Sequence, residues 1–159
     1  MDPTYFQDTF AALTKSLFYE RGRGAYFRAT LVGRDYIDRH QIHGDTSEAV
    51  IENCIDVLVE NHLVEKAAYQ KDESDSFFTF EVKGCAHLPV EAWLKEEGVP
   101  AFVCPPINMI LYKIRQRIGL AVEIADITVR HRERRCVVRV VIFKQGKEIG
   151  NDQKSDCAG

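Results

Sequence analysis

Apolar residues recur with helical spacing in the first part of the chain. Asp2 followed by Pro3 is typical of a helix start, with an N-cap residue and a proline at the first helical position. The apolar residues behind this start, three or four positions apart, are Phe6, Phe10, Leu13 and Leu17. This pattern predicts a helix from about residue 3 to Glu20. The glycine-containing segment 21–24 then interrupts it, and we expect a second helical stretch over 26–37.

A helix and a hairpin follow. Asp45 with Glu48 forms a capping box, in which each side chain reaches a backbone N–H at the helix start, and the helix is predicted to end near Asn61. Two apolar-aromatic runs, Leu63–Tyr69 and Phe77–Val82, flank an acidic stretch and predict a β-hairpin. A winged-helix DNA-binding protein has the same order of elements. However, the acidic tip and the acidic helix surface would repel a phosphate backbone. Only the order of elements supports a nucleic-acid partner, and the charge argues against one.

Two helices and two strands complete the pattern. A short helix is predicted over about 89–98 and a longer one over about 106–118. In the first strand the apolar residues change phase, which predicts a bulge near Ala125. The second strand, Cys136–Phe143, is apolar on both faces except at Arg139. We therefore expect this strand in the centre of the sheet.

These elements predict one α+β domain over residues 1–143, an antiparallel sheet packed against several helices, and a polar tail over 144–159. The 159 residues are 45% hydrophobic and 28% charged, as in one soluble globular domain. No apolar run approaches the about 20 residues of a membrane span, and the N-terminus lacks a secretory signal. We therefore expect a cytoplasmic protein with no membrane span, whose cysteines are free thiols.

The charge is unevenly distributed. The net charge is −3, yet the C-terminal part from residue 113 carries 11 Lys and Arg against 6 Asp and Glu. Much of this excess lies in 130–135, Arg-His-Arg-Glu-Arg-Arg. Such a cluster suits a solvated turn between strands, or a docking edge for an acidic partner.

Three residues carry the chemistry of soft metal ligands: Cys85, His87 and Cys104. They suit zinc, iron or an iron–sulfur cluster, and a Cys-Pro pair such as Cys104-Pro105 also occurs in some haem-thiolate sites. Their spacing is irregular and a fourth ligand is not evident, so the plainer interpretation is two buried thiols and an exposed histidine. Cys85 or Cys104 activated by His87 is a candidate nucleophile, but no catalytic spacing stands out, and enzyme activity is not predicted.

The segment Phe18–Arg23 resembles the tyrosine–acid–x–Gly–Arg stretch that opens the 4-vinyl-reductase-like domain, a hydrocarbon-binding fold related to the small subunits of the TRAPP vesicle tether. The likeness extends over about residues 10–143, with Cys85 after the hairpin and Cys136 in the last strand. The resemblance implies a Bet-like or 4-vinyl-reductase-like architecture. It also implies a pocket between helices and sheet for an apolar or aromatic molecule, and a homodimer.

The resemblance also bears on the metal. Sensory members of the family bind zinc, and Cys85 and Cys136 match two of their ligand positions, with Asp126 as a third candidate. The segment 124–129 contains no cysteine, and Cys104 has no counterpart in the family pattern. We therefore expect the zinc site of the family to be missing here.

The leading hypothesis is a noncatalytic regulatory or sensory domain that binds a small hydrophobic molecule. The aromatic candidates for the pocket lie in or beside its flanking helices: Tyr26, Trp93, Phe102 and Tyr112. Arg23 and Arg28 are candidates to meet a ligand carboxylate. One alternative is a metal- or cofactor-binding protein or enzyme that uses Cys85, His87 and Cys104. The other is the winged-helix DNA-binding protein.

Overall fold

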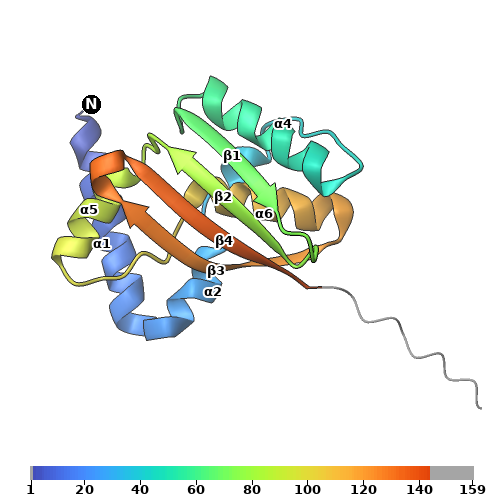
Figure 1. Cartoon of the computed structure of the whole chain (residues 1–159). Coiled ribbons are helices and arrows are strands. Elements are labelled where there is room, and N and C mark those ends of the chain that lie inside the picture. Colours follow the sequence, from blue (N-terminus) through green and yellow to red (C-terminus); the bar gives the residue numbers. More distant parts are fainter. Residues whose placement is uncertain (1, 144–159) are drawn as a thin grey trace, which may run out of the picture.

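A four-stranded antiparallel sheet forms the middle of the computed structural model, which describes residues 2–143 (Figure 1). Its strands lie in the order β1 (Lys66–Lys71), β2 (Phe77–Lys83), β4 (Arg135–Phe143) and β3 (Ala121–Arg130). β4 therefore lies between two other strands, as its apolar residues on both faces predict. The α+β class and the antiparallel sheet are confirmed, whereas the tail predicted over 144–159 lies outside the described residues.

The main core lies between this sheet and two helices, α4 (Ser47–Glu60) and α6 (Pro105–Ile118). Its largest fully buried side chains include Phe78, Phe80, Ile51, Leu58, Ile107, Ile110 and Ile114. They come from alternate positions of β2 and from positions three, four or seven apart on the helices, because those spacings place residues on one face. Burial of each such side chain contributes roughly 1.5–3 kcal/mol, so the main core is the chief source of stability.

A smaller cluster joins three helices, α1 (Pro3–Arg21), α2 (Ala25–Ala29) and α5 (Leu88–Glu96), which we call the helical layer. Its buried residues are Ala11, Ala25, Ala29, Val90, Leu94, Val99, Phe102 and Val103. Figure 1 shows the helical layer on the side of β3, whereas α4 lies on the side of β1. Within residues 2–143, the helices lack the combination of length and apolar character that a membrane span needs.

The predicted helical stretch over 26–37 is broken in the structure. A 3₁₀ turn, η1 (Gly22–Gly24), leads into α2, and α3 (Arg34–Ile37) follows only after a turn. Gly33 has a φ of 92°, and a Cβ at this position would lie 2.6 Å from Cγ of Met109 on α6. The chain therefore turns at Gly33, where glycine adopts left-handed backbone at little cost and lets α6 approach closely.

The start of α4 also differs by one residue from the prediction. Thr46, not Asp45, is the N-cap, and its Oγ1 accepts a hydrogen bond from the Ala49 N–H at 3.2 Å. Glu48 does not complete a capping box; it accepts a hydrogen bond from the Ser47 hydroxyl at 2.8 Å. That bond and the Glu48 N–H hold the pKa of this carboxyl below its usual range.

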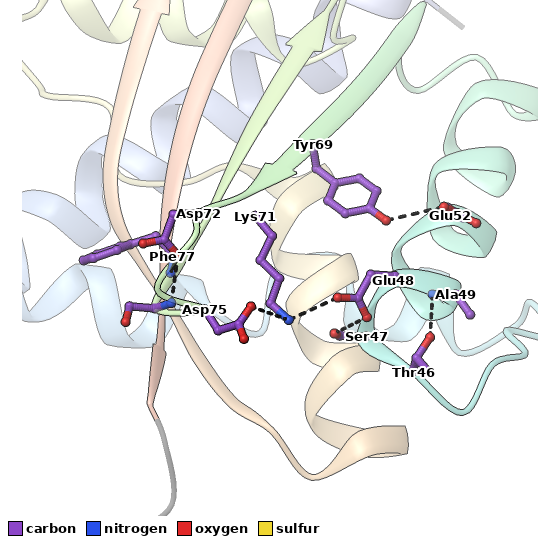
Figure 2. A network of polar contacts seen from close by, with 11 residues as sticks. Thr46, Ser47, Glu48, Ala49, Glu52, Tyr69, Lys71, Asp72, Asp75 and Phe77 are labelled. Atoms are coloured by element: carbon purple, nitrogen blue, oxygen red, sulfur yellow. Dashed lines mark hydrogen bonds and ion pairs between the residues drawn. The ribbon is translucent and has the colours of Figure 1, made fainter.

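The side chain of Lys71 links the acidic hairpin tip to the start of α4 (Figure 2). Lys71 Nζ lies 3.1 Å from Oε1 of Glu48 and 3.2 Å from Oδ1 of Asp75. Oδ1 of Asp72 accepts a hydrogen bond from the Phe77 N–H at 2.8 Å, which closes the turn. Because β2 also pairs along its length with β4, the hairpin is half of a continuous sheet and not a free wing.

The predicted bulge in β3 is confirmed. Ile124 is in register with Val140 and Asp126 with Arg139, so Ala125 has no partner on β4. A bulge bends its strand and increases the local twist. It therefore gives the two halves of β3 different orientations, and each half borders a different cavity.

Candidate ligand cavity and thiol cluster

A cavity of about 720 Å³ lies between the helical layer, α6 and the first half of β3. We call it the ligand cavity. Its walls come from η1 and α2, from Phe102 in the segment before α6, from α6 itself, and from residues 121–124. The volume falls within the roughly 300–1,000 Å³ of pockets that hold drug-sized molecules.

One wall of the ligand cavity is aromatic. The ring of Phe102, only 3% exposed, lies 5.6 Å from the ring of Tyr26 and 5.7 Å from that of Phe18, centroid to centroid. Phe27 also borders the cavity and is 72% exposed. Rings at these distances form a large apolar surface against which another ring can stack or pack edge to face.

The polar and charged residues that line the ligand cavity are Arg23, Thr30, Asn108, Arg115 and Glu123. Asn108 on α6 is 4% exposed, and its Nδ2 donates to the Ala29 carbonyl at 2.7 Å. This bond leaves the Asn108 Oδ1 as an acceptor without a partner among the described residues. Arg115, half-buried on the same helix, donates a hydrogen bond to the Val122 carbonyl. Asn108 and Arg115 lie seven positions apart and therefore on one face of α6.

Two exposed charged side chains complete the lining, Arg23 on η1 and Glu123 on β3. Neither side chain forms an ion pair or hydrogen bond within residues 2–143. The cavity is therefore bordered by two guanidinium groups and one carboxylate.

Three of the six candidates for ligand binding line this cavity: Arg23, Tyr26 and Phe102. Arg28, Trp93 and Tyr112 do not. Trp93 lies on α5, where Lys15 Nζ is 5.1 Å from its ring centroid, and the Tyr112 hydroxyl donates to Asp38 at 2.9 Å. Asn108 and Arg115 were not predicted as site residues, although a polar pair seven positions apart on an otherwise apolar helix face is visible in the sequence.

A second, much smaller cavity of about 10 Å³ lies behind the second half of β3. It is lined by all three predicted metal-ligand residues, Cys85, His87 and Cys104, and in addition by Glu91 and Cys136. We call these five residues the thiol cluster. They come from four places: the end of the hairpin, the start of α5, the segment before α6, and β4. Only the folded chain brings these segments together.

The histidine of the thiol cluster is not exposed, contrary to the plainer interpretation of the sequence. The side chains of His87 and Glu91 are 11% and 6% exposed, and Nε2 of His87 lies 3.1 Å from Oε1 of Glu91. The ring of Phe10 packs edge-on against the imidazole, at 4.7 Å between centroids. His87 and Glu91 meet because residues four apart near a helix start share one face.

Burial disfavours the thiolate form of the three cysteines in the cluster. Burial raises the pKa of the Cys136 thiol to about 12, raises the pKa of Cys85, and raises that of Cys104 well above its usual range. A protonated thiol is a poor nucleophile, and the ring Nε2 of His87 already faces Glu91. This geometry therefore does not favour the Cys–His nucleophile considered from the sequence.

The donor set of the thiol cluster suits zinc, but its arrangement does not. Thiol, imidazole and carboxylate are all zinc ligands. Within the described part of the chain, however, no three His, Cys, Asp or Glu side chains are arranged to hold a metal ion. Asp126, the third candidate from the family pattern, does not line this cavity, and its Oδ2 accepts a hydrogen bond from Thr128 at 3.1 Å.

The basic segment 130–135 forms the β3–β4 connection around η2 (His131–Glu133), and acids neutralise much of it. Arg134 pairs with Glu65 at 2.8 Å, and Arg135 pairs with Glu81 at 3.0 Å and with Glu133 at 2.6 Å. These contacts tie the turn to the neighbouring strands. They fit a solvated turn better than a surface for phosphates.

β3 thus borders both candidate sites, with residues 121–124 on the ligand cavity and Ile127 and Val129 on the thiol cluster. The bulge at Ala125 separates the two. Comparison of the chain with models of known protein families and with curated proteins found no match.

Proposed function

We propose that this chain is a noncatalytic regulatory or sensory domain that binds a small apolar or aromatic molecule in the ligand cavity. The observation that carries the proposal is the cavity of about 720 Å³ with an aromatic wall of Phe102 and Tyr26. Binding sites of this kind combine a largely apolar lining with a few polar groups that orient the ligand. Here those groups are Asn108 and Arg115.

The resemblance to the 4-vinyl-reductase-like domain supports the same proposal, because it implies a pocket between helices and sheet for an apolar or aromatic molecule. The ligand cavity also lies between helices and sheet, with the helical layer on one side and β3 on another. A ligand there would contact both the helical layer and the sheet. Binding would therefore stabilise their contact, which is a physical route from occupancy to regulation.

The test uses N-phenyl-1-naphthylamine, a neutral aromatic molecule that fluoresces when it leaves water. We expect saturable binding and a higher midpoint of thermal unfolding, because a ligand that binds only the folded state stabilises it. Tyr26→Ala should weaken binding. The matched control is Tyr19→Ala, since Tyr19 is 64% exposed on α1 and does not line the cavity. Equal binding by the two variants, or no binding by the native chain, would contradict the proposal.

A second candidate function is binding of a soft metal ion, and one observation favours it: five donor side chains surround one small cavity. Binding would require those side chains to turn toward the cavity and the thiols to lose their protons. Titration of reduced protein with Co²⁺ tests this, since cobalt thiolates absorb in the near ultraviolet. Cys85→Ser should abolish the band, whereas the control Cys54→Ser, which does not line this cavity, should keep it. A native chain without the band would remove this candidate.

A further inference from the structure

We infer that the ligand of the cavity is an amphipathic anion, with an apolar or aromatic body against Phe102 and one carboxylate or similar oxyanion bound by Arg115. This inference rests on the proposed function and adds the chemical class of the ligand. It is carried by the surroundings of Arg115 and by the distribution of charge along the cavity.

Arg115 is a half-buried guanidinium with unused donors. Among residues 2–143 it forms one side-chain hydrogen bond, to the Val122 carbonyl, which holds the guanidinium against β3. No carboxylate pairs with Arg115 within residues 2–143. Arg135, in contrast, is paired with both Glu81 and Glu133. A guanidinium presents a fork of N–H donors that matches an oxyanion, and such charge-assisted hydrogen bonds are among the strongest in proteins.

The other charged groups at the cavity do not cancel the attraction of Arg115 for an anion. Glu123 would oppose an anion, but its side chain is exposed, where water and salt weaken its field. Arg23, also exposed, offsets Glu123. Arg115 is less exposed than either, so its attraction for an anion is screened least.

Asn108 adds a second fixed point. Its Oδ1 is an acceptor at the cavity, and α6 separates Asn108 from Arg115 by about 10 Å along its axis, at about 1.5 Å per residue. A ligand that places its acid on Arg115 therefore has room for an aromatic body before it reaches Asn108. A hydroxyl or N–H group at that end of the body would donate to Oδ1.

The test compares two fluorescent molecules that differ by one acidic group, 8-anilino-1-naphthalenesulfonate and N-phenyl-1-naphthylamine. We expect the sulfonate to bind the native chain about tenfold more tightly and to displace the neutral molecule, since one charge-assisted hydrogen bond is worth about a factor of ten. Arg115→Gln should remove this preference and leave the affinity for the neutral molecule within about twofold. The matched control is Arg117→Gln, because Arg117 lies on the same helix and does not line the cavity.

Two milder variants keep the test decisive if Arg115→Gln folds poorly. Arg23→Gln should weaken binding of the sulfonate and Glu123→Gln should strengthen it, each about two- to threefold, with no change for the neutral molecule. Arg28→Gln, exposed and outside the cavity, is the control for Arg23. Equal affinities for both molecules, unmoved by these variants, would overturn the anionic ligand and leave the proposed function standing. Failure of both molecules to bind would overturn the proposed function itself.

Discussion

The main core and the helical layer differ in how completely they bury their large apolar side chains. The main core buries large side chains completely; Phe78, Phe80 and Ile110 are each 0% exposed. The helical layer buries mainly small residues and leaves large ones in solvent, with Phe6 59% and Leu13 65% exposed on α1. The ligand cavity lies where the helical layer meets the sheet. The difference teaches that stability resides in the main core, whereas the less filled contact provides room for a ligand.

The largest expected effect concerns the buried thiols. A thiol with a pKa of about 12, as for Cys54 and Cys136, reacts about 10³-fold more slowly at pH 8 than an ordinary cysteine, because its thiolate is correspondingly rarer. Iodoacetamide labelling of a Cys157→Ala variant, followed by mass spectrometry, measures this. Faster labelling of Cys85 and Cys104 than of Cys54 would show that the packing around the thiol cluster opens separately from the packing around α4. Rapid labelling of all four would contradict the burial described here.

The next largest expected effect is a difference in stability between two Phe→Ala variants, one in the main core and one at the ligand cavity. Phe80→Ala should lower the free energy of unfolding by about 3–5 kcal/mol, because it leaves a void in the main core. Phe102→Ala should cost less than half as much, since it enlarges a cavity that already exists, while it weakens binding of N-phenyl-1-naphthylamine. Urea denaturation measures both. Equal losses of stability would show that the two regions are packed equally well.

An ion pair holds the segment after α3 to the main-core helix α6. Lys113 Nζ lies 2.6 Å from Oδ1 of Asp38, and the lysine side chain is 8% exposed. The pKa of Asp38 lies below its ordinary 3.8, and the hydrogen bond from Lys113 contributes most to this shift. Asp38→Asn should therefore cost about 1–2 kcal/mol, less than a fully buried pair because Asp38 is about a third exposed.

The pH dependence of that pair has a definite sign. A carboxyl whose pKa is lower in the folded state stabilises the fold fully above its unfolded pKa. The stability difference between the native chain and Asp38→Asn should therefore be constant above about pH 5 and shrink as the pH falls below 3.8. Urea denaturation at several pH values measures it. A difference that persists at the lowest pH would assign the effect to packing instead of charge.

The smallest effects concern the helix caps. Thr46→Ala removes the acceptor for the Ala49 N–H and should cost about 1 kcal/mol of global stability, because α4 packs in the main core. Asp2→Ala should instead fray only the start of α1, which hydrogen exchange detects as faster exchange at Thr4. A global loss from Asp2→Ala would mean that the helical layer and the main core unfold as one unit.

Sequence patterns predicted most elements because their periodicity is local. The helix after Asp2, the hairpin, the central place of β4 and the bulge near Ala125 are confirmed. The helical stretch over 26–37 was wrong because the break at Gly33 depends on the approach of Met109 from another helix. The capping box at Asp45 was wrong by one residue, since Thr46 is also a favourable N-cap residue and is the one that caps α4 in the structure.

The sequence by itself determined the periodic elements and the presence of thiols, aromatic rings and arginines. The tertiary structure decided which of these meet. It placed Tyr26 and Phe102 on the ligand cavity with Asn108 and Arg115, and left Trp93 outside. It gathered Cys85, Cys104 and Cys136 around one cavity and buried them, and this burial raises the pKa of each thiol. The physical reason is that hydrophobic periodicity depends on residues within one element, which are close in the sequence. A site, in contrast, is formed by residues from elements far apart in the sequence, and only the packing of the whole chain brings those elements together.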